Sequence, residues 1–510
     1  MRKRIVVMLG GAMYALFAAF GFQAERFGES RPLTGLMTAL VLWPIASGVL
    51  SLLLRKSGQR GKNAQGSFSP IKAFWAIFGC YVPMFLITFP GSFAYDVPFQ
   101  LEQVFTGQYS THHPLLHTWL MGGFVKLGHH IGNINLGAAL YTAAQMAALA
   151  ACFACVCASI ERQSGARAAR LSAAFFAVYP LHMMMAVNAT KDVLFSGLFV
   201  LTLALAREAM MLGLGRRLGM ALVLCGAGMM LLRNNALYAV AVWIVLLALM
   251  GGRRAFKICG ALMLAAVLCV GGNKLMQRAA DAVDGSAVEM LSWPIQQMAR
   301  ARNLYGDRLE GWEMQAIDEM MPDGSWALYQ PTISDPVKFE FDMEKLSSDP
   351  GKYAKAYLSI GMKCPKAYFD ALLMHTYSFF YPYGEYRVAG YYLQMEVGEE
   401  YYDWCGFERI SSKSFAPRIL SSLSWRFGAK GAMQIPVIGY LFNMGVIVWI
   451  MLYLVIREAY LGRWQSFACA LLPVLLWGTF LLGPVMAGRY IYPFVCCLPV
   501  MASCPKKREG

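Results

Sequence analysis

Charge is what this sequence has little of, because only 15% of its 510 residues are Asp, Glu, Lys or Arg while 57% are hydrophobic. Soluble domains carry about 25% charged residues, so the composition excludes an ordinary soluble protein and indicates a polytopic membrane protein. The remaining charges are unbalanced, with 45 basic against 30 acidic residues. The basic residues stand in short clusters between apolar runs. That distribution is typical of cytoplasmic loops and argues against a nucleic-acid-binding surface.

Several catalytic motifs are also missing. The chain has no Gly-rich loop leading into Lys-Ser or Lys-Thr, no His-Glu-x-x-His zinc motif and no Gly-x-Ser-x-Gly motif. These absences argue against an ATP-driven pump, a zinc hydrolase and a serine hydrolase. Most of the 13 cysteines lie in apolar runs, where they behave as small apolar residues. Cys364 and Cys405 lie in a polar region, where a disulfide and a free pair of thiols are both open.

Apolar runs that approach the length of a membrane span recur along the chain. A span needs about 20 mostly apolar residues, so we expect about twelve spans. The first follows Arg2–Arg4 without a clear small-x-small cleavage site, which is typical of an uncleaved signal anchor. The predicted spans are Ile5–Phe22, Leu33–Leu54, Ile71–Thr88, Leu136–Ile160, Leu171–Val187, Val193–Leu212, Leu218–Leu232, Ala236–Met250, Ile258–Gly272, Ile435–Ile456, Ser466–Val485 and Tyr490–Ala502.

The segment 115–128 decides the topology. If it crossed the membrane, the basic loop 161–170 would lie outside. If it forms a helix on the outer surface, every basic cluster and both termini lie inside, in agreement with the positive-inside rule. We therefore predict a surface helix. The chain then divides into an N-terminal membrane core (1–272) with an outer loop at 89–135, a mainly helical extracytoplasmic domain (273–433) and C-terminal membrane helices (434–510).

Charged residues stand at four outer corners of this predicted topology. Asp96 and Glu102 follow the third span, and Lys191 and Asp192 lie between the fifth and sixth. Arg233 lies between two spans that are shorter than the bilayer, and Arg489 lies between the last two spans. Each alone is compatible with a charge that snorkels to the interface. Together they indicate a shared pocket, because charges at membrane depth need water, each other or a substrate. Cations there suit a phosphate or pyrophosphate, and a carboxylate suits a general base.

The order of these residues resembles the GT-C superfamily of integral-membrane glycosyltransferases, which includes protein mannosyltransferases and the aminoarabinose transferase of lipid A. The chain is most similar to a bacterial branch of that group without an assigned function. The resemblance covers the membrane core from about residue 71 to 273 and, more weakly, the last spans. The matching residues are Tyr95-Asp96, His112-His113-Pro114-Leu115, Lys191-Asp192 and Arg489-Tyr490.

The resemblance implies an inverting transfer of a hexose or pentose from a polyprenyl-phosphate donor to a cell-envelope glycan, lipid or protein. The reaction would occur on the outer face of the cytoplasmic membrane of a bacterium. Asp96 would be the catalytic base, with Tyr95, Glu102, Asp192 and Tyr490 in support. The donor phosphate would lie among Lys191, Arg233, Arg489, His112 and His113.

Two departures and two alternatives accompany this interpretation. Two additional spans precede the outer loop. That loop carries a single Asp where several branches of the superfamily carry a pair of carboxylates. A bound divalent cation is therefore an open possibility and not an expectation. No other cofactor is expected. A transporter or flippase of a lipid-linked saccharide could use the same outer cations without catalysis, but it should show charges at mid-membrane or on both sides. An oligosaccharide polymerase or ligase would share the donor and differ in the acceptor.

Overall fold

The computed structural model describes residues 1–57, 67–94, 96–382, 395, 397, 409–428 and 435–504. Over these ranges the chain is built from helices, and extended segments pair only in isolated bridges. Eight helices are long and apolar enough to cross a membrane, so the chain is a multi-pass helical membrane protein. They are α1 (Arg2–Phe27), α2 (Pro32–Ser57), α3 (Pro70–Thr88), α6 (Ile134–Ser164), α9 (Lys191–Leu212), α12 (Arg253–Ala279), α20 (Met444–Leu461) and α21 (Trp464–Leu481).

The other predicted spans form shorter helices, so the count of twelve stays a prediction. These helices are α7 (Ala166–Val178), α8 (Pro180–Ala186), α10 (Arg216–Leu232), α11 (Asn235–Met250) and α22 (Tyr492–Ala502). The prediction of one helix over 171–187 is wrong, because the chain breaks between α7 and α8. Tyr179 precedes a proline and takes an extended backbone conformation (φ −68°, ψ 122°). A proline disfavours the helical conformation in the residue before it.

The predicted start of the span 435–456 is also wrong. The chain first makes a short 3-10 helix, η7 (Ile438–Leu441), and α20 begins nine residues later than predicted, at Met444. The side chain of Asn443 accepts a hydrogen bond from the backbone N–H of Val446 and so caps the new helix. The predicted domain boundary at 273 is likewise shifted, because α12 continues to Ala279.

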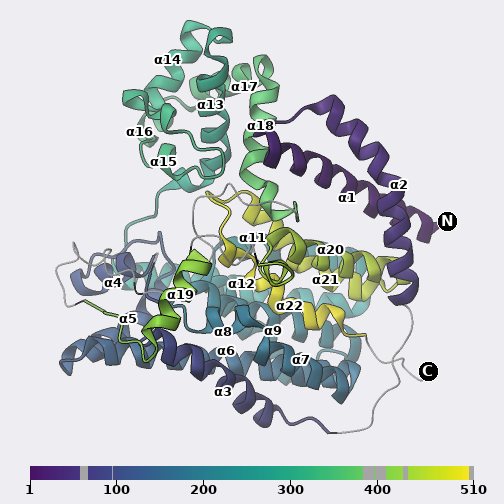
Figure 1. Ribbon diagram of the computed structural model, residues 1–510. Coiled ribbons are helices and arrows are strands. Elements are labelled where there is room, and N and C mark those ends of the chain that lie inside the picture. The colour runs from purple at the N-terminus through teal and green to yellow at the C-terminus, as the bar shows by residue number, and fades with distance from the viewer. Residues whose placement is uncertain are drawn as a thin grey trace.

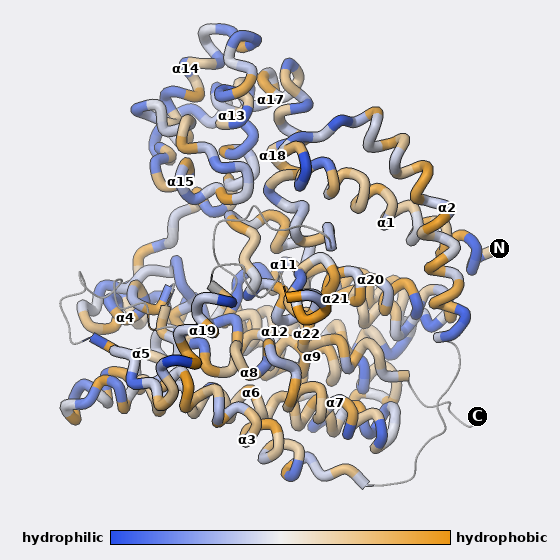
Figure 2. Tube along the Cα trace, viewed as in Figure 1, coloured by the Kyte–Doolittle hydropathy of each residue, from blue (hydrophilic) through white to orange (hydrophobic). Residues whose placement is uncertain are grey.

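Helices α9 and α22 form the centre of the membrane body. Nearly every residue of α9 is buried, and α22 packs on α9 with Tyr492, Phe494 and Val495 inaccessible. Helices α6, α10, α20 and α21 surround this pair. Hydrophobic residues dominate the body in Figure 2, whereas hydrophilic residues gather at its two ends and in the lobe outside it. We call the end at which α9 begins the site end, and the end at which α1 begins the basic end.

The predicted surface segment 115–128 is helix α5 (Leu115–His130), which packs against the first turns of α6. A Cβ atom on Gly128 would lie 2.6 Å from Cα of Gly137, so only glycine allows this approach of the two backbones. With 31 residues, α6 is about 46 Å long and exceeds the roughly 30 Å hydrocarbon core of a bilayer. Helix α5 is not among the eight candidate spans. Its place on the surface stays a prediction.

A lobe of short helices stands beside the membrane body (Figure 1). It has its own core, to which Ile295, Ile317, Val337, Tyr353 and Ile360 contribute. We call it the helical domain. Its elements are η1 (Ala287–Leu291), α13 (Ser292–Tyr305), η2 (Gly306–Arg308), α14 (Gly311–Met320), η3 (Pro322–Leu328), α15 (Asp335–Lys338), α16 (Met343–Ser348), α17 (Pro350–Lys363), α18 (Pro365–Thr376) and η4 (Tyr377–Phe379). Cys364 is buried in this core, and Cys405 lies outside the described residues, so their pairing stays a prediction.

The turn between α1 and α2 holds the helical domain in place. Ser30 N–H donates to Oδ1 of Asp370 at 2.8 Å, and Lys366 Nζ contacts Glu29 at 2.7 Å and Asp370 at 2.8 Å. Arg300 lies 3.6 Å from the same Asp370 carboxylate, which is fully buried. A buried carboxylate with three such partners is a structural ion pair, because removing one partner would leave an uncompensated charge. The α1–α2 hairpin therefore connects the membrane body to the helical domain, and we call it the strut.

Candidate functional site

The two residues at the centre of the candidate site stand at the starts of two helices. Asp96 immediately precedes α4 (Val97–Thr106), and Lys191 is the first residue of α9. The segments before them pair, since Ser92 N–H donates to the Val187 carbonyl at 2.9 Å and Ala189 N–H to the Ser92 carbonyl at 2.8 Å. This pairing places both helix starts at the same end of the body. Asp96 and Lys191, which lie 95 positions apart in the sequence, are thereby brought together.

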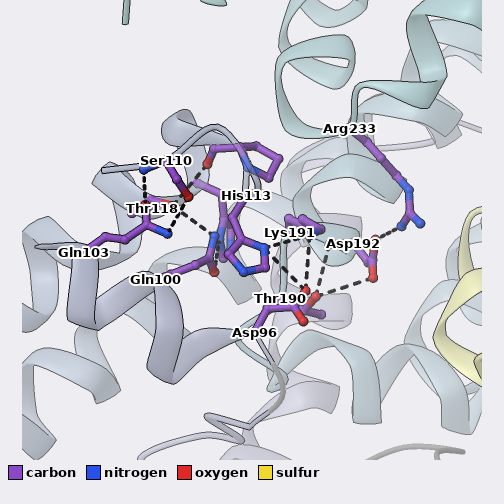
Figure 3. Close-up of polar contacts among 12 residues, drawn as sticks. Asp96, Gln100, Gln103, Ser110, His113, Thr118, Thr190, Lys191, Asp192 and Arg233 are labelled. Atoms are coloured by element: carbon purple, nitrogen blue, oxygen red, sulfur yellow. Dashed lines mark hydrogen bonds and ion pairs between the residues drawn. The ribbon is translucent and has the colours of Figure 1, made fainter. Parts of the chain in front are cut away.

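Asp96 lies among three nitrogen-bearing side chains. Its Oδ2 is 3.2 Å from Lys191 Nζ, 3.7 Å from Arg489 Nη2 and 4.0 Å from His113 Nδ1. Lys191 Nζ also lies 3.5 Å from the same His113 nitrogen. Figure 3 shows Lys191 beside His113, with both side chains directed toward Asp96. The Asp96 side chain is 28% exposed, so this ionic group remains open to a ligand.

A second carboxylate continues the cluster. Asp192 is almost fully buried, forms an ion pair with Arg233 and lies 3.5 Å from Arg489 Nε. Arg489 belongs to the short helix η8 (Gly488–Ile491) and therefore connects the two carboxylates. The Arg233 guanidinium lies over the rings of Phe480 and Tyr490, at 4.5 and 4.7 Å from their centroids. Aromatic faces of this kind hold a cation in place.

Most contacts within this cluster are long. Among the described residues, Lys191, Arg233 and Arg489 contact the carboxylates of Asp96 and Asp192. Apart from the Arg233–Asp192 pair, these contacts lie between 3.2 and 4.0 Å. Charge-assisted hydrogen bonds are usually about 2.7–2.9 Å long. Cations held by such long contacts can accept an anion by shifting side chains that are already in place.

The charge states of Asp96 and His113 follow from these neighbours. Burial by itself raises the pKa of Asp96, but Lys191 and Arg489 oppose it and hold the pKa well below its usual range. Burial, together with the charge of Lys191, lowers the pKa of His113 to about 3. At neutral pH the site therefore contains an ionised Asp96 and a neutral His113. A carboxylate held in this way is a weak base until its cations find another anion.

A buried hydrogen-bond network, which the sequence did not reveal, supports the starts of both helices. His117 Nδ1 lies 3.1 Å from Gln100 Oε1, and its Nε2 lies 2.8 Å from the hydroxyl of Tyr141. Tyr141 in turn contacts Gln145 Oε1 at 3.1 Å. Gln145 Nε2 donates to the carbonyls of Ala186 and Asn188, at 3.0 and 2.9 Å.

This network joins α4, which begins beside Asp96, to the loop that leads into Lys191. Burial lowers the pKa of His117 to about 3, so its ring is neutral within the network. The sequence does carry one signal for it. Tyr141 and Gln145 form an i, i+4 polar pair in an otherwise apolar span, and such a pair inside a membrane helix usually faces a partner.

The helical domain and the linker before it reach two segments that carry site residues. Trp293 Nε1 donates to the Leu481 carbonyl at 2.7 Å, and Ser334 N–H to the Pro484 carbonyl at 2.9 Å, just before Arg489. On the other side, the linker between α12 and η1 contacts Thr111. Thr111 N–H donates to the Val283 carbonyl at 2.9 Å, and Gly285 N–H donates to Thr111 Oγ1 at 2.8 Å. This second contact adjoins His112 and His113, so the domain and its linker border two sides of the site.

Some predicted site residues lie elsewhere. Tyr95 falls outside the described residues. Glu102 lies on α4 six residues after Asp96, and among the described contacts its carboxylate has none with the ionic cluster. His112 is exposed and packs edge-on against His113, with ring centroids 4.6 Å apart. Tyr490 contacts Arg233 through its ring.

The residues present do not suit a divalent cation. Within the described ranges, no group of three or more His, Cys, Asp or Glu side chains is arranged to hold a metal ion. Asp96 and Asp192 are already surrounded by three cations, which repel another positive ion. The same arrangement favours a ligand of negative charge.

Comparison with known proteins identifies the family of this chain, which is a family of unknown function. Residues 95–504 match a model described as a family of unknown function, DUF6020, and the chain therefore belongs to that family. The matched region contains every predicted site residue and leaves out α1, α2 and α3. Neither the curated proteins nor the solved structures gave a match.

Proposed function

We propose that the protein is a membrane glycosyltransferase that moves a sugar from a polyprenyl-phosphate donor to an acceptor hydroxyl of the cell envelope. The supporting observation is the cluster in which Asp96 lies among Lys191, Arg489 and His113 at one end of the membrane body. Cations that converge from three separate segments suit a phosphate, and a carboxylate between them suits a base. We place this end on the outer face of the cytoplasmic membrane of a bacterium.

The cations of the cluster suit a singly charged donor phosphate. A phosphodiester that links a sugar to a polyprenyl chain carries one negative charge, and Lys191 and Arg489 lie at distances from Asp96 that let them turn toward it. The donor phosphate would draw Arg489 and Lys191 away from Asp96. The pKa of Asp96 would then rise, because the cations that depress it would share their charge with the phosphate. Donor binding thus makes the carboxylate a better base.

The chemical step then follows. The acceptor oxygen attacks the anomeric carbon from the face opposite the phosphate while its proton passes to Asp96. A carbon–oxygen bond to the acceptor forms, the bond to the phosphate oxygen breaks, and polyprenyl phosphate leaves with an additional negative charge. Arg489, Lys191 and Arg233 stabilise this charge as it develops, which is the electrostatic contribution that lowers the barrier most in many enzymes.

The helical domain is suited to the acceptor. Its hydrogen bonds reach the segment 481–484 before Arg489, and the linker that leads into it from α12 bonds to Tyr109 and Thr111, close to His113. An acceptor bound to this domain would lie near the sugar. Its binding would also bear on the two segments that position the phosphate-binding cations.

A flippase of the same lipid-linked saccharide is the alternative. The observation that could favour it is a second group of buried charges at the basic end, which includes Arg207, Glu208, Arg457 and Glu458. A transporter uses charges within the membrane or on both sides of it. These charges, however, form close contacts with each other and with backbone carbonyls, which favours a structural role.

The test is sugar transfer by the purified protein in vesicles. Polyprenyl-phosphate hexoses and pentoses labelled in the sugar would be supplied with envelope extract as acceptor. We expect label to leave the lipid donor and polyprenyl phosphate to accumulate with wild-type protein. We expect neither with Asp96→Asn. Glu340→Gln, which removes an exposed carboxylate of the helical domain, is the matched control. Movement of intact donor across the vesicle membrane without cleavage would support the flippase instead.

A further inference from the structure

A large cavity lies between the α1–α2 hairpin and α20, within the membrane body. Its volume is about 650 Å³, within the range of roughly 300–1,000 Å³ that ligand pockets usually have. Gly10, Gly11 and Ala46 line it on the hairpin side, and Trp449 and Tyr453 line it on α20. The wall is almost entirely apolar. A dry apolar cavity does not hold ordered water, so hydrocarbon is its natural occupant in a bilayer.

The length of the cavity matches one leaflet of a bilayer. On α20 its lining residues run from Val446 to Ile456 on one face of the helix, a rise of about 15 Å. The hydrocarbon core of a bilayer is roughly 30 Å thick, so a chain from one leaflet extends about half as far. Helix α2 forms one wall of the cavity, and little of this helix is buried, so the cavity lies at the periphery of the molecule.

Basic residues stand at one end of the cavity. Leu53 lines it, and Arg55 and Lys56 follow on the exposed last turn of α2. Cationic side chains at a membrane surface attract anionic lipids. A phospholipid with its acyl chain in the cavity would place its phosphate near these two side chains.

The cavity is separate from the candidate site. Its lining comes from α1, α2, α20 and Pro382, whereas the ionic cluster comes from the starts of α4 and α9, His113, Arg233 and η8. The hairpin also lies outside the part of the chain that matches the family. We propose that this cavity binds one acyl chain of an anionic phospholipid, with the headgroup at Arg55 and Lys56. The lipid fills the gap beneath the strut that holds the helical domain.

Native mass spectrometry of the detergent-purified full-length protein tests the proposal without any activity assay. The probes are dioleoyl phosphatidylglycerol, dioleoyl phosphatidylcholine and a polyprenyl phosphate, each titrated separately. We expect the wild-type protein to retain one phosphatidylglycerol in preference to the other two. Ala46→Trp fills the cavity and should weaken that binding about tenfold or more, the equivalent of roughly two buried methylene groups.

Val41→Trp is the matched control, because Val41 lies on the same helix, is 67% exposed and does not line the cavity. It should bind lipid like the wild type. Replacement of Arg55 and Lys56 by Gln should reduce the preference for phosphatidylglycerol about fivefold per charge while keeping the chain in place. If Ala46→Trp does not fold, Val49→Phe replaces it. Equal retention by the Ala46→Trp and Val41→Trp variants, or a preference for polyprenyl phosphate, would overturn the proposal.

Discussion

Buried charges lie at both ends of the membrane body, and they are arranged differently. At the site end, Asp96 is shared among Lys191, Arg489 and His113, with contacts of 3.2 to 4.0 Å. At the basic end, Arg162 binds both oxygens of Glu208 at 2.6 and 2.8 Å. Ser159 donates a third hydrogen bond to the same carboxylate at 2.7 Å. The contacts at the site end are long and shared among several side chains, whereas those of Glu208 are short and include a bidentate pair.

The basic end also holds the last turn of α22. Arg207 donates to the Ser503 carbonyl at 2.6 Å and to its hydroxyl at 2.8 Å, and Arg457 donates to the Met501 carbonyl at 2.7 Å. The last four carbonyls of a helix have no partner within the helix, and cations near a helix C-terminus are favourable. These arginines therefore stabilise the fold at a helix end that would otherwise be unsatisfied.

The comparison separates two reasons for burying a charge. A bidentate pair with short contacts has no capacity left for a ligand, so its removal should affect stability. A carboxylate shared by several cations at longer distances has such capacity, so its removal should affect function. A variant at the site end that mainly loses stability, or a variant at the basic end that mainly loses activity, would contradict this division.

The largest expected effect is on activity at the site end. Asp96→Asn should lower sugar transfer about 10²–10⁴-fold, the usual contribution of a general base. The melting temperature in detergent should fall less than it does in Glu208→Gln, because Asp96 is partly exposed and its contacts are long. Glu208→Gln is the counterpart at the basic end. It should cost about 1–3 kcal/mol of stability through lost charge-assisted hydrogen bonds, with unchanged activity per folded molecule. The reverse pattern would contradict the division.

The next effect concerns the donor phosphate. Arg489→Gln removes the side chain that connects Asp96 and Asp192, and should lower kcat/KM for the lipid donor about 10- to 100-fold. Arg489→Lys keeps the charge and should recover part of the loss. Turnover at several donor concentrations would check this. If the acceptor dependence changes while the donor dependence does not, the assignment of this cation to the phosphate is wrong.

A smaller effect is expected at the end of α22. Arg207→Gln leaves carbonyls of the last turn without a partner and should lower stability by about 2–4 kcal/mol. Thermal unfolding in detergent would measure it, with Arg254→Gln as control, because that side chain also donates to backbone carbonyls but is less buried. A stable but inactive Arg207→Gln variant would mean that the basic end takes part in function, as the flippase would require.

The sequence allowed much of the site end to be predicted and little of the basic end. Asp96, Lys191, Arg233 and Arg489 could be singled out because a charge within apolar sequence is unusual and costly. The structure brings them together through the paired segments that precede α4 and α9. Arg207 and Glu208 went unnoticed because they lie where a span meets a basic cluster, and such clusters are expected there for topology alone.

The supporting structure was harder to predict. Gln100 is an ordinary residue in sequence, and only the fold brings it to His117 and so to the Tyr141–Gln145 pair. The break between α7 and α8 had a visible signal in Pro180, but the apolar character of the whole run outweighed it in our prediction. Hydrophobicity indicates where spans lie. It says less about where a helix begins or breaks, since those points depend on single prolines and caps.

The smallest predicted effect tests the charge state of the site end. The pKa of His113 is lowered to about 3, so the folded protein does not bind a proton there between pH 7.5 and 5.5, whereas the unfolded chain does below about pH 6.5. Stability should therefore fall as the pH falls, by up to about 1 kcal/mol per pH unit from this residue. His113→Asn should make the melting temperature fall less steeply as the pH falls. The decline that remains should include a contribution from His117, whose pKa is lowered in the same way.

Asp96 does not contribute to the pH dependence of stability in this range. Its pKa lies well below the range, so the stability that it contributes is lost only in stronger acid. Parallel pH profiles for the wild type and His113→Asn would mean that His113 binds its proton over the same pH range in the folded protein as in the unfolded chain. Below about pH 6.5 the site end would then carry an additional positive charge, and a doubly charged pyrophosphate would suit it better than a phosphodiester.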